Sequence, residues 1–111
     1  MKRTAAERVS DIAEHIDKIL LATHGKTLET LEEDYILVAA VVRWLEIIGE
    51  ATKYVPNSIK EKYPNIPWRQ MAGMRDVAIH DYSDLKIERI FNTIQNDIPT
   101  LKKQIDAIEI E

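Results

Sequence analysis

The sequence predicts an all-α fold: an antiparallel bundle of four main helices plus a short helical turn, in one domain over residues 1–111. Apolar residues recur at helical spacing through most of the chain. Three glycines and four prolines are too few for the many tight turns of an all-β fold. A chain of 111 residues is long enough for one hydrophobic core and hardly for a second.

Capping and stop signals bound the helices in order. Thr4 and Glu7 have the spacing of a capping box ahead of the first apolar stripe, and Gly25 is placed to end that helix. Thr30 and Glu33 form a second possible capping box. The expected elements are helices over about residues 5–24 and 31–54, a short turn over 58–63, a loop over 64–67, and a third helix from Trp68.

The helix expected over 31–54 is apolar on two faces, which is typical of a central helix. Its broader face includes Gly49, which is small enough to allow close helix packing. Its second face carries Ile36, Ala40, Trp44, Ile47 and Ala51. So short a chain can hardly cover both faces by itself. The second face is therefore either a dimer surface or the site on which the last helix of the same chain packs.

The last third of the chain predicts a fourth helix with an interruption. Ser83 and Asp84 have the composition of a helix cap, and apolar residues follow at helical spacing from Leu85 to Ile98. Pro99 is expected to kink or break this helix, because proline removes a backbone hydrogen bond. The apolar stripe then continues to the end of the chain.

Composition and charge exclude several kinds of function. With no cysteine and no closely spaced histidine pair, we expect no metal site and no cofactor. We also expect no membrane segment and a cytoplasmic location, since no apolar run reaches the required length. The net charge of -4 argues against DNA as a partner. Residues 43–75 nevertheless carry more basic than acidic side chains. These basic side chains form either a local site for an anion or ordinary solvated surface.

Polar side chains gather around a short apolar run near the end of the third helix: Arg75, Asp76, His80, Asp81 and Tyr82. On one helix Arg75 and Tyr82 would lie within about 20° of each other, whereas Arg75 and His80 would lie about 140° apart. Either the helix ends before His80, or a second chain completes the site. A cap immediately after Tyr82 favours a break near His80.

Arginine and histidine together suit chemistry on a phosphodiester. A neutral imidazole can take the proton of an RNA 2'-hydroxyl, and an imidazolium can protonate the leaving oxygen. A guanidinium can stabilise the charge that grows on the phosphate oxygens. One chain supplies one such histidine, His80, and a symmetric dimer supplies two. The alternative is a structural Arg–His–Asp cluster at a helix end.

The pattern Arg-x4-His-x-Tyr, formed by Arg75, His80 and Tyr82, resembles the signature of HepT-like proteins of the HEPN superfamily. These proteins are toxins of prokaryotic toxin–antitoxin pairs. The resemblance covers nearly the whole chain, with matching segments in the family's order at residues 45–51, 63–68, 74–82 and 97–101.

The resemblance implies an all-helical homodimer in which two Arg–His motifs face each other across a composite cleft. It implies a metal-independent endoribonuclease that cuts RNA by 2'-hydroxyl attack, with Arg75 and His80 as catalytic residues. It also implies an MntA-like nucleotidyltransferase antitoxin, of a type VII-like pair, that transfers AMP to Tyr82. One departure is Asp76, where the family often has asparagine; its carboxylate opposes an anion unless it pairs with Arg75 or His80.

Arg43, Glu46 and Glu50 line up along the helix over 31–54. They form either a surface ion-pair ladder or a support from which Glu46 or Glu50 orients Arg75 or His80. Glu50 is favoured for that second role, because it lies in the matching segment 45–51. Beside the ribonuclease, two other functions stay open: a non-catalytic helical adaptor that binds a minimal nucleotidyltransferase, and a plain structural dimer.

Overall fold

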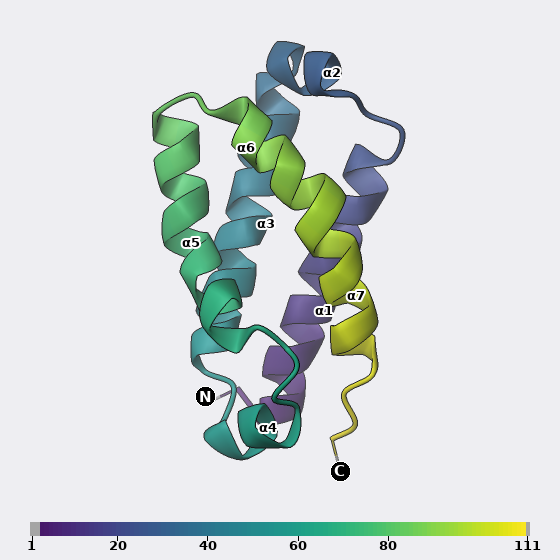
Figure 1. The fold of residues 1–111 in the computed structure, drawn as a ribbon, viewed down its shortest axis with the longest axis vertical. Helices are drawn as coiled ribbons and strands as arrows, with labels where there is room; N and C mark the ends of the chain where they lie inside the picture. The colour runs from purple at the N-terminus through teal and green to yellow at the C-terminus, as the bar shows by residue number, and fades with distance from the viewer. Residues whose placement is uncertain (1–2, 111) are drawn as a thin grey trace.

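The computed structural model describes residues 3–110 and arranges them as a helical bundle (Figure 1). Within that range no strand occurs, which confirms the all-α prediction. The elements are α1 (Ala5–Thr23), α2 (Leu28–Glu33), α3 (Tyr35–Lys53), α4 (Asn57–Lys62), α5 (Trp68–Ser83), α6 (Ile87–Asn92), the π-helical turn η1 (Thr93–Asp97) and α7 (Ile98–Asp106). Figure 1 shows α1, α3 and α5 along the long axis, with α6, η1 and α7 crossing them as one helical stretch.

Helix α3 is the centre of the bundle, since it packs against α1 on one side and α5 on the other. Its buried face includes Val41, Leu45 and Ile48. The buried polar side chain in this face, Thr52, donates a hydroxyl hydrogen bond to the Ile48 carbonyl at 2.7 Å, so its own donor is paired. None of the helices within residues 3–110 is long and apolar enough to cross a membrane.

The helix ends confirm the N-terminal cap predicted at Thr4 and correct the one predicted at Thr30. The Thr4 hydroxyl accepts a hydrogen bond from the Glu7 amide at 3.1 Å, and Gly25 follows α1 with a φ of 73°, the conformation that favours glycine. The predicted box at Thr30 is wrong, because Thr30 lies inside α2 and its amide donates to Thr27 Oγ1. Asp34 instead caps the central helix, so the expected helix over 31–54 is two helices.

Helix α5 does not break near His80, contrary to the prediction from sequence. It continues through His80 to Ser83, and Asp84 forms its C-terminal cap rather than the start of the next helix. The reversal occurs at Leu85, which has a φ of 57°, in the left-handed region that a leucine seldom adopts. Sequence reasoning missed this turn because no glycine or asparagine marks it.

The expected interruption near Pro99 takes the form of a wider turn, and the helix continues. The π-helical turn η1 ends at Asp97, and the Ile98 amide, which precedes Pro99, donates to the Thr93 carbonyl. Pro99 then lies in the first turn of α7, where a missing amide hydrogen costs little.

The second apolar face of α3 is only partly covered by the chain itself. Ala51 is buried, Trp44 and Ile47 are half-buried, and Ile36 is 68% exposed. The last helix, α7, packs mainly on α1. The idea that the chain's own last helix buries this face is therefore wrong, and the face stays open beside α5.

Candidate active site

Arg75 is positioned by the closest approach of α3 and α5. A Cβ atom built on Gly49 would lie 2.7 Å from the Arg75 backbone nitrogen, so only glycine fits at this crossing. The close approach also brings Glu50 alongside, with its Oε2 atom 3.8 Å from Arg75 Nε. Arg75 Nη1 donates a hydrogen bond to Asp76 Oδ1 at 3.4 Å, and the arginine side chain remains 45% exposed. The guanidinium is thus flanked by two carboxylates and still open to solvent.

His80 lies in the last turn of α5 with 70% of its side chain exposed. Its Nε2 atom is 3.2 Å from Asp84 Oδ2, one helical turn further on. Sequence reasoning placed Asp84 in a helix cap and so missed this contact. The i, i+4 spacing would have found it had the helix been expected to continue.

Because α5 is continuous, Arg75 and His80 project from it about 140° apart. The structure therefore removes one of the two arrangements considered, a helix end between them. Within one chain it does not pair the guanidinium with the imidazole; each side chain meets its own carboxylate.

Tyr82 and Asp81 differ sharply although they are neighbours. Tyr82 is exposed near the end of α5. The Asp81 side chain is only 7% exposed, and its Oδ1 lies 3.6 Å from Arg89 Nη1. Asp81 therefore ties the end of α5 to α6 and faces away from the exposed motif.

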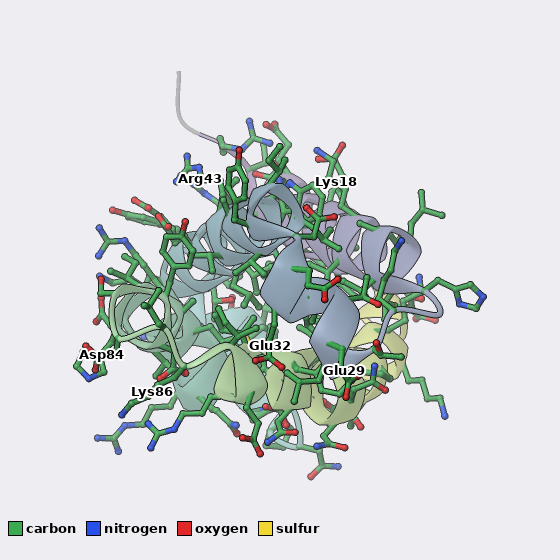
Figure 2. The ribbon with its side chains drawn as sticks, turned by 90° about the horizontal axis from the view of Figure 1, so that it is seen from above. Lys18, Glu29, Glu32, Arg43, Asp84 and Lys86 are labelled. Carbon is green, nitrogen blue, oxygen red and sulfur yellow. The ribbon has the colours of Figure 1, made fainter. Side chains whose placement is uncertain are left out.

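Arg43 and Glu46 form an ion pair of their own at 3.4 Å, one turn or more away from Glu50 along α3. Figure 2 shows Arg43 apart from Asp84 on the outer surface, with Asp84 beside Lys86 at the edge of α5. Of the three residues that line up on α3, the structure brings only Glu50 to the motif.

The remaining histidines lie elsewhere. Buried His15 donates its Nδ1 hydrogen bond to the Asp11 carbonyl at 2.7 Å, which is a packing role. Exposed His24 follows the end of α1. Among residues 3–110, no group of three or more histidine, cysteine, aspartate or glutamate side chains is placed to hold a metal ion.

The chain is similar to known proteins over most of its length. The model of the Ribonuclease HepT-like family matches residues 12–108. The probable ribonuclease HepT of Thermococcus cleftensis is 42% identical over 108 residues, which cover 97% of this chain and 98% of the relative. A Methanocaldococcus jannaschii protein, provisionally named an RNase, is 39% identical over 96% of this chain and 88% of its own length.

A shorter match joins the chain to the mRNA nuclease HepT of Shewanella oneidensis, 30% identical over 43 residues, or 39% of this chain and 32% of that protein. No solved structure matches the chain.

Proposed function

The chain belongs to the Ribonuclease HepT-like family, and from this premise we propose that it is an endoribonuclease toxin that cuts RNA without a metal ion. The observation that carries the proposal is the placement of Arg75 and His80, exposed on one continuous helix and each beside a carboxylate. The exposed cations Lys53 and Arg69 add to the positive field on the same part of the chain.

The exposed imidazole supplies the acid and base steps. The contact of His80 Nε2 with Asp84 favours a proton on that nitrogen, which leaves Nδ1 free as the acceptor. Nδ1 takes the proton of the 2'-hydroxyl, and the 2'-oxygen attacks the neighbouring phosphorus. The bond to the 5'-oxygen breaks, and a protonated imidazole gives that oxygen its proton. The products carry a 2',3'-cyclic phosphate and a 5'-hydroxyl.

Arg75 stabilises the negative charge that develops on the phosphate oxygens. Glu50 and Asp76 hold the guanidinium from two sides, so they act as positioning residues. An RNA phosphate must compete with these carboxylates for the arginine, and we expect it to replace the weaker, longer contact to Glu50.

Two chains form the complete site in this proposal. The 140° offset between Arg75 and His80 prevents one chain from placing both on one phosphate, whereas a two-fold partner can bring its own His80 to the cleft. The exposed Ile36 and half-buried Ile47 of α3 offer an apolar surface for this homodimer.

Regulation is proposed at Tyr82, whose ring is exposed in the last turn of the motif helix. An MntA-like nucleotidyltransferase antitoxin would join AMP from ATP to the tyrosine oxygen and release pyrophosphate. The added phosphate would compete with RNA for Arg75, and the adenosine would occupy the space of the substrate.

A non-catalytic adaptor is the second candidate function, and one observation favours it. Three carboxylates, those of Glu50, Asp76 and Asp84, surround the motif and weaken its attraction for a phosphate. An adaptor that presents substrate to a nucleotidyltransferase would tolerate this charge.

Incubation of the purified protein with total RNA in EDTA tests the ribonuclease. We expect cleavage in EDTA, cyclic phosphate ends, and a loss of about 10²–10⁴-fold in rate for His80→Ala. His24→Ala is the matched control, since His24 is also exposed but lies beyond α1. No cleavage by the wild-type protein, or activity that needs a divalent ion, would contradict the proposed mechanism.

A further inference from the structure

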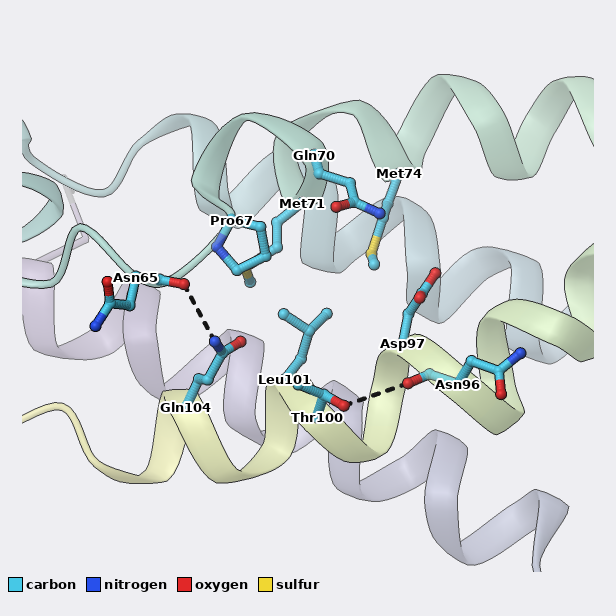
Figure 3. Close-up of a pocket in the computed structure, with 10 residues that line it drawn as sticks. All are labelled: Asn65, Pro67, Gln70, Met71, Met74, Asn96, Asp97, Thr100, Leu101 and Gln104. Carbon is cyan, nitrogen blue, oxygen red and sulfur yellow. Dashed lines mark hydrogen bonds between the residues drawn. The ribbon is translucent and has the colours of Figure 1, made fainter.

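A cavity of about 230 Å³ lies between the first turns of α5 and the helical stretch formed by η1 and α7 (Figure 3). Its walls include Met71 and Met74 from α5 and Leu101 from α7, which are apolar and buried. The polar part of the lining includes the side chains of Gln70, Asp97 and Gln104. Neither Arg75 nor His80 belongs to it, so the cavity is separate from the proposed active site.

Two segments that the sequence analysis singled out meet at this cavity. Residues 63–68 contribute Asn65 and Pro67, and residues 97–101 contribute Asp97 and Leu101. Neither segment contributes a side chain to the Arg–His site. The turn that carries Asp97 is the π-helical turn η1, a rare conformation that often occurs at functional sites.

Gln104, one of the residues that line the cavity, carries a buried hydrogen-bond acceptor without a partner among residues 3–110. Gln104 Nε2 donates to the Asn65 carbonyl at 3.2 Å, and this bond fixes which end of the amide is the oxygen. The oxygen, Oε1, is buried and accepts no hydrogen bond from any residue between 3 and 110. A buried acceptor of this kind is costly unless a donor reaches it.

The second polar wall is a carboxylate. Asp97 extends from η1 toward α5, where the Gln70 side chain also points into the space between the helices (Figure 3). Two hydrogen bonds join lining residues, one from Gln104 to Asn65 and one from Thr100 to Asn96. Neither bond uses the side chain of Asp97 or of Gln70. Among residues 3–110 no lysine or arginine lines the cavity, so the charge of the described lining is negative.

We propose that this cavity binds the guanidinium group of an arginine side chain from a partner polypeptide. A guanidinium has only donors, and its fork matches the two oxygens of the Asp97 carboxylate while a further N–H reaches Gln104 Oε1. The methylene stem would pack on Met71, Met74 and Leu101. A phosphate would be repelled, because the cavity offers a carboxylate and no cation.

Size supports a single side chain over a whole small molecule. The volume of about 230 Å³ lies below the range of roughly 300–1,000 Å³ that is usual for pockets of complete ligands. The proposal is independent of ribonuclease activity, because it uses none of the residues assigned to the cleavage of RNA.

The test is a titration of the ¹⁵N-labelled full chain with acetyl-Gly-Arg-Gly-amide, followed by NMR. We expect the amide signals of Met71 and Leu101 to shift in a saturable way, and the same peptide with citrulline in place of arginine to leave them unchanged. Asp97→Asn should weaken binding at least tenfold, whereas Glu88→Gln, which changes the net charge equally on exposed α6, should change it less than twofold. Gln104→Leu should also weaken binding, and it replaces Asp97→Asn as the test if that variant does not fold.

Several outcomes would overturn the proposal. These are the absence of saturable shifts, equal binding of the citrulline peptide, or a folded Asp97→Asn variant that binds as wild type does. Tighter binding of free L-arginine than of the capped peptide would assign the cavity to the free amino acid. Displacement of the peptide by a short single-stranded RNA would assign it to a nucleobase instead. Activity on RNA need not change in any of these cases.

Discussion

Two helix pairs of the bundle pack in different ways: α1 with α7, and α3 with α5. Lys102 of α7 joins Asp17 of α1 and Asp106 of its own helix, both at 2.8 Å, across a polar outer surface. The α3–α5 pair approaches until only Gly49 fits between the backbones, and it leaves apolar Ile36 of α3 exposed. The first pair is complete within one chain, while the second combines tight internal packing with an open apolar surface. The proposed function lies on the second pair.

The largest effect is expected where α3 meets α5. Gly49→Ala adds a Cβ 2.7 Å from the Arg75 backbone nitrogen, which neither helix can relieve without moving. We expect a loss of about 1–3 kcal/mol in the free energy of unfolding, and a Tm lower by roughly 5–15 °C, because overpacking is costly. Cleavage of RNA should also fall, since Arg75 moves with its backbone.

Gly73→Ala is the matched control, because a Cβ at Gly73 on α5 meets nothing within 4 Å. It should raise the stability by up to about 1 kcal/mol through its better helix propensity. Thermal unfolding at one fixed protein concentration compares the two variants. If Gly49→Ala were as stable as Gly73→Ala, close packing at Gly49 would not hold Arg75 in place.

The open surface of α3 predicts the next largest effect. Ile36→Arg places a charge on a side chain that is 68% exposed, on the second apolar face of α3, where the proposed partner chain would pack. We expect a folded monomer in sedimentation and at least a tenfold loss of RNA cleavage. Leu21→Arg is the control, since Leu21 is 83% exposed on α1 and should leave the dimer intact. A wild-type monomer at micromolar concentration would rule out the two-chain cleft.

These two regions also show how far the sequence predicts the fold. Apolar periodicity and the Thr4 and Gly25 signals located α1 to within a residue, because local capping chemistry decides where it ends. The small size of Gly49 predicted close packing, and the structure confirms it. Local signals misplaced the start of the central helix, since Thr27 and Asp34 do the capping in place of Thr30.

The sequence predicts which residues form the candidate site better than it predicts how they contact one another. Arg75, His80 and Glu50 are visible in the sequence, and the contact of Glu50 with Arg75 follows from helix packing. The contact of His80 with Asp84 was missed, because the continuation of α5 depends on a leucine with positive φ that no local rule anticipates. The cavity beside η1 depends on tertiary packing alone.

Tyr82 tests whether the open surface is also a regulatory one. Tyr82→Phe removes only a hydroxyl from an exposed ring, so we expect RNA cleavage to stay within about twofold of wild type. The variant should escape silencing by the nucleotidyltransferase partner with ATP and magnesium, because the oxygen that receives AMP is gone. Intact mass should show one added AMP on the wild-type protein and none on the variant. Equal silencing of both proteins, without added mass, would remove Tyr82 as the modified residue.

The smallest effect on stability is expected in the α1–α7 pair. Hydrogen bonds to Asp106 and Asp17 raise the pKa of Lys102 above its ordinary value, so the folded state favours the charged amine. Stability from this shift is fully present below the unfolded pKa of about 10.5 and is lost as pH rises through the higher folded pKa. Lys102→Met should therefore lower the Tm by a few degrees at most between pH 7 and 9, and the difference should shrink as the pH rises above about 10.5 and in high salt. Lys103→Met, at an exposed neighbour that forms no ion pair within residues 3–110, should change the Tm less. Equal effects of the two variants would show that the link between α1 and α7 depends on apolar packing alone.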